Sequence, residues 1–237
     1  MTTIARIAVA VLLALSLSAC PRLAKPPAPG QPPVAAGMPS RPSVPGAVVY
    51  GIDSEHSDLH VLVYRGGPMA RLGHNHVVSS RNVSGWVWLH PSLERSGFDI
   101  VLPVASLIVD DPDSRREEGA DFEGDVPSDA REGTYANMLR AEVLDGEHFP
   151  RVTLKSSKVG GSLPRPVVTA EISVKAMTRS VEIPVQTAVD GRSLIVSGEF
   201  ALKQTEFGMT PFSVALGALR VEDELRIKFK LRAQAPD

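Results

Sequence analysis

The chain has 237 residues, of which 43% are hydrophobic, and a formal net charge of −2 at pH 7. A charge this close to zero gives no electrostatic basis for binding nucleic acid or anionic lipid, so no nucleic-acid partner is expected. The single cysteine, Cys20, excludes an intramolecular disulfide framework and a zinc site built on several cysteines.

Residues 1–19 have the pattern of a bacterial export signal. Arg6 precedes an apolar run over residues 7–17, which is too short for a transmembrane helix, since such a helix needs about 20 residues. The tetrad Leu17-Ser18-Ala19-Cys20 resembles the lipobox of bacterial lipoproteins, in which the cysteine becomes the lipid-bearing first residue of the mature chain. The pattern predicts an exported protein anchored to a membrane through lipid on Cys20. An ordinary signal peptide with an incidental cysteine is the alternative.

Residues 20–46 are expected to be a proline-rich linker, because nine of the 20 prolines lie in residues 21–46. Proline has no backbone donor for helices or sheet ladders, so a disordered tether is predicted, with an upper reach of roughly 80 Å at about 3.1 Å per residue. A ligand for a proline-recognising protein is the alternative to a spacer. Pro21, in place of Asp after Cys20, favours the periplasmic face of an outer membrane.

The folded domain is expected over residues 47–234, where apolar and polar residues alternate in short runs bounded by turn residues. Asp190-Gly191 separates two such runs and is a hairpin signal. In the clearest run, Leu225, Ile227, Phe229 and Leu231 share one face, and Arg226, Lys228, Lys230 and Arg232 share the other. About nine such strands are expected. Strands with one dry face are typical of antiparallel sheets, and closure or folding over removes open edges.

One segment is predicted to be a helix, with Ser128 as its N-cap and Asp145-Gly146 at its end. The apolar residues at helical spacing are Tyr135, Met138, Leu139 and Val143. Before this helix, residues 110–129 carry nine Asp or Glu. A solvated loop is predicted there, and calcium binding is the alternative, although the spacing does not match an EF-hand loop.

Gly73-His74-Asn75-His76 is the sharpest polar motif. On an extended strand, His74 and His76 point to the same face about 6–7 Å apart, which suits two ligands of one metal. A metal or haem iron needs further ligands, and none of the other histidines has a spacing that forces it to converge on this pair. A structural role, or one in binding a polar head group, is therefore preferred over a metal site at His74 and His76.

Known catalytic templates are absent from the sequence. It contains no Gly-x-Ser-x-Gly elbow, no His-Glu-x-x-His motif, no phosphate loop and no dinucleotide fingerprint. A non-catalytic protein is therefore expected.

Several motifs together resemble the YceI-like family over most of residues 50–232, and their order and spacing carry the resemblance. The motifs are Tyr50-Gly51-Ile52-Asp53, Val104-Ala105-Ser106-Leu107, Met138-Leu139, Phe149-Pro150-Arg151-Val152-Thr153, Ala176-Met177-Thr178-Arg179-Ser180 and Glu206-Phe207-Gly208-Met209. The resemblance implies a mainly β fold: an extended, antiparallel, lipocalin-like barrel with one short helix packed at an end. It further implies an elongated apolar cavity for a polyisoprenoid, quinone-like lipid or similar amphiphile. Homodimers are common among proteins of this kind.

The residues expected to contact such a ligand are large and apolar. They are Phe98, Met138, Leu139, Leu154, Phe200, Phe207 and Phe229. A barrel of about eight strands is just wide enough for one ligand or for the protein's own side chains. The predicted function is a lipid-anchored carrier that faces the periplasm. The alternatives are a metal- or haem-binding protein using His74 and His76, or a ligand-free structural barrel.

Overall fold

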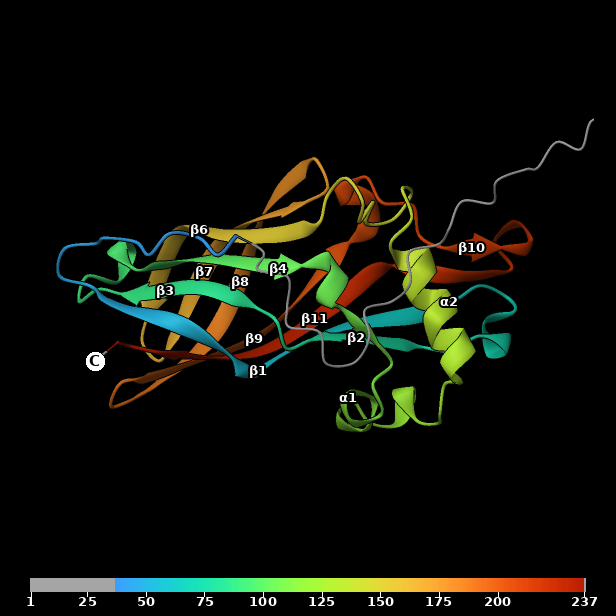
Figure 1. Cartoon of the computed structure of the whole chain (residues 1–237), viewed down its shortest axis with the longest axis horizontal. Helices are drawn as coiled ribbons and strands as arrows, with labels where there is room; N and C mark the ends of the chain where they lie inside the picture. Colours follow the sequence, from blue (N-terminus) through green and yellow to red (C-terminus); the bar gives the residue numbers. More distant parts are fainter. Residues whose placement is uncertain (1–36, 237) are drawn as a thin grey trace, which may run out of the picture.

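The computed structural model describes residues 37–236. The predicted signal over residues 1–19, the lipid site at Cys20 and the linker up to residue 36 lie outside the described residues. Within them, the strands form one sheet in the order β10-β11-β9-β8-β7-β6-β4-β3-β1-β2-β5, and β11 also pairs with β1. This last pairing closes eight strands into an antiparallel barrel (Figure 1).

The closed ring is built from the longer strands. They are β1 (Val48–Gly66), β3 (Ser84–Leu89), β4 (Gly97–Pro103), β6 (Arg151–Ser162), β7 (Arg165–Val174), β8 (Met177–Asp190), β9 (Ser193–Lys203) and β11 (Leu219–Gln234). Three strands lie beyond the ring: β2 (His76–Ser80), β5 (Ile108–Val109) and β10 (Ser213–Val214). The described part thus has eleven strands where about nine were expected, because β5 and β10 are too short to show alternation.

Two short α-helices and six 3-10 turns connect these strands. The helices are α1 (Pro112–Glu117) and α2 (Ser128–Met138). The 3-10 turns are η1 (Ala70–Leu72), η2 (Leu93–Arg95), η3 (Val104–Ser106), η4 (Ala120–Phe122), η5 (Gln204–Phe207) and η6 (Ala215–Gly217). Among the described residues, no helix is long and apolar enough to span a membrane.

The predicted alternation is confirmed where it is clearest. On β11, Ile227 and Leu231 are buried, while Arg226 and Lys230 are exposed. The predicted hairpin also forms: β8 ends at Asp190, and Gly191 turns the chain with a φ of 57°, a region that glycine adopts without steric cost.

Helix α2 differs from its prediction at both ends. Its N-cap is Pro127, and no side chain caps it, so the predicted Ser128 cap is wrong. Proline suits this position because its fixed φ, −55° here, leads into the helix. The helix ends at Met138 because the chain then turns back on itself. The amide of Leu144 donates to the Met138 carbonyl, so Val143 lies outside the helix.

The two ends of the barrel differ in construction (Figure 1). The turn end, as we call it, carries the short connections at residues 90–96, 163–164 and 191–192. The helical end carries the long connections, residues 104–150 and 204–218, which include α2, η5 and β10. At the helical end Phe207 is fully buried, packed with Ile172, Ile183 and Met209.

Candidate functional site

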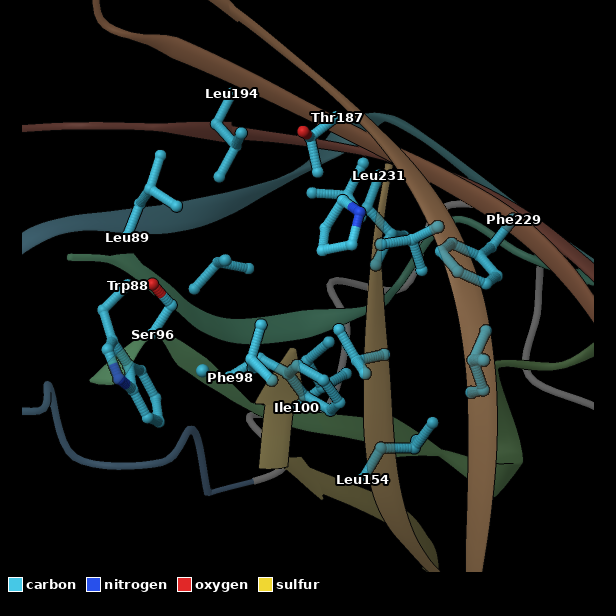
Figure 2. Close-up of a pocket in the computed structure, with 18 of the residues that line it drawn as sticks. Trp88, Leu89, Ser96, Phe98, Ile100, Leu154, Thr187, Leu194, Phe229 and Leu231 are labelled. Atoms are coloured by element: carbon cyan, nitrogen blue, oxygen red, sulfur yellow. The ribbon is translucent and has the colours of Figure 1, made fainter. Parts of the chain in front are cut away.

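A cavity of about 140 Å³ lies inside the barrel. This space is about ten times the ~10–15 Å³ that one buried water needs. Inward-facing side chains of the barrel strands form its wall, and Figure 2 shows ten of these residues with labels. The wall includes Leu59, Val87, Ile100, Val168, Val185, Val196 and Leu231.

Four of the seven residues expected to contact a ligand line this cavity: Phe98, Leu154, Phe200 and Phe229. All four are only partly buried although they come from the inward faces of their strands. Phe200 and Phe229 also contact each other edge to face, with ring centroids 6.4 Å apart. Open space in front of these side chains accounts for their incomplete burial.

The other three expected residues, Met138, Leu139 and Phe207, are not among the lining residues. Met138 and Leu139 pack at the helical end, against the core cluster that contains Val104 and Leu107. Phe207 is the last residue of η5, and its side chain points into the core. Gly208 caps this turn in a left-handed conformation with a φ of 69°. These side chains close the helical end instead of lining the open space.

Several wall residues were missed from the sequence, among them Ile183, Val185, Leu194 and Val196. These residues belong to the alternating runs on either side of Asp190-Gly191, which predict strands with one buried face. That same alternation is the signal for a cavity wall, but it does not tell a filled interior from an open one.

The cavity reaches the surface at the turn end. Leu163 lines it and is 48% exposed, at the β6–β7 turn. Leu93, Ser96 and Pro166 line the same region, next to the β3–β4 and β6–β7 connections. We call this opening the mouth.

The polar groups of the wall are already hydrogen-bonded within the protein. Of the described residues that line the cavity, none is charged. Thr187 Oγ1 donates to the Pro164 carbonyl at 3.2 Å, and Trp88 Nε1 donates to the Arg95 carbonyl at 3.1 Å. Ser96 Oγ accepts from the amide of His90 at 2.9 Å. The wall therefore suits hydrocarbon, which needs apolar contacts and no hydrogen-bond partner.

The two histidines singled out from the sequence lie away from this cavity. Their ring centroids are 6.4 Å apart. His74 is exposed, whereas His76 Nδ1 lies 2.6 Å from Oδ2 of the buried Asp110. Across residues 37–236, no group of three or more His, Cys, Asp or Glu side chains is placed to hold a metal. His76 thus contacts a buried carboxylate of the protein, and neither histidine lines the cavity.

Residues 110–126, which we call the cover segment, pack on the outside of β1 and β2. Phe122 is 2% exposed and packs with Leu62, Val77 and Tyr64. The predicted solvated loop is therefore wrong for the buried residues Asp110, Arg115 and Phe122, whereas Asp113, Glu117, Asp121, Glu123 and Asp125 are exposed as predicted. One aromatic side chain anchors the segment, and its inward-facing carboxylates are paired.

Two buried carboxylates fasten the cover segment. Oδ1 of Asp110 accepts from Arg115 Nη1 at 2.6 Å and from the amide of Val77 at 3.0 Å. Glu118 lies 2.7 Å from His60 Nδ1 and accepts from Lys228 Nζ at 2.6 Å. Burial raises the pKa of both carboxyls, but their hydrogen bonds and charged partners outweigh it, so each pKa lies below its usual value.

The end of the linker also packs against the barrel. Trp86 Nε1 donates to the Pro39 carbonyl at 2.8 Å, and the Arg41 guanidinium lies 5.7 Å from the centre of the Trp86 ring. Arg95 Nη2 donates to the Pro45 carbonyl at 3.4 Å. The prediction of a disordered tether is thus wrong for residues 37–46. A proline-rich segment leaves backbone carbonyls without hydrogen bonds, and the side chains of Trp86 and Arg95 donate to two of them.

Comparison with known proteins settles the family. A model of the YceI-like domain matches residues 50–233. The chain belongs to the YceI-like family. Members of this family are known as polyisoprenoid-binding barrels and are generally non-catalytic.

Solved structures share the fold. The Burkholderia cenocepacia protein BcnA is 19% identical, with a TM-score of 0.58, over 77% of this chain and 99% of BcnA. A variant of the Campylobacter jejuni YceI protein is 11% identical, with a TM-score of 0.50, over 68% of this chain and 85% of that protein. A search of curated proteins found no match.

Proposed function

We propose that this YceI-like protein is a non-catalytic carrier or reservoir for a polyisoprenoid, quinone-like lipid or similar amphiphile. The observation that supports this most is the cavity wall, which has no charged side chain among its described residues and whose polar groups are paired within the protein. The hydrocarbon tail lies in the barrel, and the polar head group stays at the mouth.

The energetics favour such a tail. Burial contributes roughly 25 cal/mol per Å², so ~400 Å² of tail contributes on the order of 10 kcal/mol before the costs of association. Because the wall has no charged side chain, binding a tail does not incur the free-energy cost of removing a charge from water. A polar ligand of the same size would lose its hydrogen bonds to water and gain none from the wall.

The protein carries out this function, in our proposal, as a lipoprotein anchored through Cys20 at the periplasmic face of the outer membrane. The support is the lipobox-like tetrad and Pro21. Replacement Cys20→Ser is expected to release the protein from the membrane fraction, as measured by fractionation of the bacterial envelope. Retention of the C20S variant in that fraction would contradict the anchor.

Two neighbouring valines on β7 provide a matched test of the cavity. Val168 lines it, whereas Val167 is 38% exposed on the outer face. Val168→Phe fills part of the space and displaces two or three methylenes of a tail. At ~0.8 kcal/mol each, this weakens amphiphile binding by about tenfold or more. The measurement is displacement of a fluorescent polyprenyl probe.

Val167→Phe adds the same side chain on the outside, so it controls for any general effect of the larger residue. The proposal expects the V167F variant to bind the probe as the wild type does. Equal affinity in V168F and wild type would contradict the cavity as the binding site.

A further inference from the structure

The helical end carries an exposed apolar tip, formed by η1 and by the hairpin of β10, η6 and the start of β11 (Figure 1). We define the tip by its exposed apolar side chains, which are Met69, Leu72, Phe212, Val214 and Leu216. The two parts are joined, since the amide of Met69 donates to the Ala218 carbonyl at 2.8 Å. The hairpin is held by the Val221 amide, which donates to the Phe212 carbonyl at 2.8 Å. The two segments that carry these apolar residues are thus adjacent.

Leu216 is fully exposed at the apex of this tip. Three consecutive residues there have left-handed backbone: Ala215 with a φ of 50°, Leu216 with 55° and Gly217 with 88°. Residues other than glycine avoid this region, and such conformations persist where the surrounding structure imposes them, often at functional positions. The turn directs a leucine into solvent, where it adds nothing to the core.

Basic residues flank the tip. Arg71 lies within η1, and Arg65 and Arg220 lie on the adjoining parts of β1 and β11. All three are exposed. Arg220 Nη2 lies 3.4 Å from Glu222, so this arginine is paired with an acid. Arg65 and Arg71 add two further positive charges beside the apolar side chains. Apolar side chains beside arginines are typical of surfaces that bind anionic bilayers.

The described part of the linker begins beside the first residue of β6. Gly37 lies next to Arg151, where β6 begins at the helical end. From there residues 37–46 run along the outside of the barrel to His90 and Arg95 at the turn end.

We infer that the tip docks on an anionic bilayer surface, with Leu216 inserted among the lipid head groups and acyl chains. The mouth lies at the opposite end of the barrel, so this docking directs it away from the bilayer. Docking requires no ligand in the cavity, and its test is therefore independent of the proposed carrier function.

The test uses the chain from residue 20 onward with Cys20→Ser, which has neither signal nor lipid. We expect it to sediment with vesicles of phosphatidylcholine and phosphatidylglycerol, and less with phosphatidylcholine alone. Leu216→Ser should lower the partition coefficient about tenfold, because one leucine side chain is no longer buried. Arg71→Ser should lower it about fivefold. Both changes are at exposed positions, and unchanged thermal unfolding will verify the fold.

Val189→Ser is the matched control, because Val189 is 51% exposed but lies on β8 near the turn end. It should partition as the parent chain does. Failure to sediment with anionic vesicles, or equal partition of L216S and the parent, would overturn the inference. A dimer in analytical ultracentrifugation that L216S abolishes, without vesicle binding, would assign the tip to a second copy and overturn it as well.

Discussion

The walls at both ends of the barrel are largely apolar, but side chains fill the helical end and leave a cavity toward the turn end. At the helical end, residues 104–150 and 204–218 are long enough to fold over the opening and place Phe207 and Leu139 inside or across it. At the turn end, the connections at residues 90–96, 163–164 and 191–192 are too short to do so. The length of the connections, more than the wall itself, decides where space is left.

This comparison suggests what the open end is for. A barrel of eight strands has an interior that side chains or one ligand fill. Side chains of the protein fill the helical end, and we propose that a hydrocarbon tail takes the equivalent place at the turn end.

The largest change in stability is expected when Phe207, which fills the helical end, is truncated. Phe207→Ala leaves a cavity at a fully buried site and should lower the free energy of unfolding by about 3–5 kcal/mol, as measured by urea denaturation. Phe200→Ala at the open cavity should cost no more than about half of that, because this side chain is only partly buried. Equal losses in the two variants would show that both ends are equally well packed.

A smaller loss is expected from the cover segment. Asp110→Asn leaves the buried Arg115 without its carboxylate and should cost about 3 kcal/mol. Asparagine tolerates the left-handed backbone of residue 110, which has a φ of 53°. Asp113→Asn is the control, because its ion pair with Arg116 is exposed and should contribute less than about 1 kcal/mol. A D110N variant as stable as D113N would contradict the fastening role of Asp110.

The same carboxylates give the stability a pH dependence. The pKa values of Asp110 and Glu118 are lowered in the folded state, so their contribution is complete above the unfolded values of about 4. It is lost progressively as the pH falls below about 4 and through the folded pKa values. Urea denaturation between neutral and acidic pH should show a shallower decline in D110N than in the wild type. Parallel declines would exclude Asp110 as a source of this dependence.

The smallest effect concerns the linker at the outer wall. Trp86→Phe removes the hydrogen bond to Pro39 and should cost about 1 kcal/mol. A nitroxide on Ser40→Cys, in the C20S background, should become more mobile in W86F by electron paramagnetic resonance. An unchanged spectrum would mean that Trp86 does not hold residues 37–46.

Much of the fold followed from the sequence because inward and outward residues alternate so regularly on β8, β9 and β11. The end of α2 could not be predicted in this way, because Met138, Leu139 and Val143 have helical spacing although the helix ends at Met138. The packing of the cover segment could not be predicted from the sequence either. Its acidic composition indicated solvent, and only the tertiary structure brings Arg115, His60 and Lys228 to its carboxylates.

The site was predictable in kind but only in part by residue. Phe98, Leu154, Phe200 and Phe229 were found because they lie on inward strand faces. Phe207 has the same chemistry but sits on a 3-10 turn that inserts it into the core. No local pattern distinguishes an aromatic residue that fills space from one that borders it, because the distinction depends on the connections at each end.

We propose that hydrocarbon occupies the open end of the barrel. The decisive experiment is native mass spectrometry of protein extracted from the bacterial envelope, followed by lipid analysis. We expect close to one long-chain amphiphile per barrel in the wild type and a marked loss in V168F. Wild-type protein without such a lipid would show that the barrel does not carry hydrocarbon.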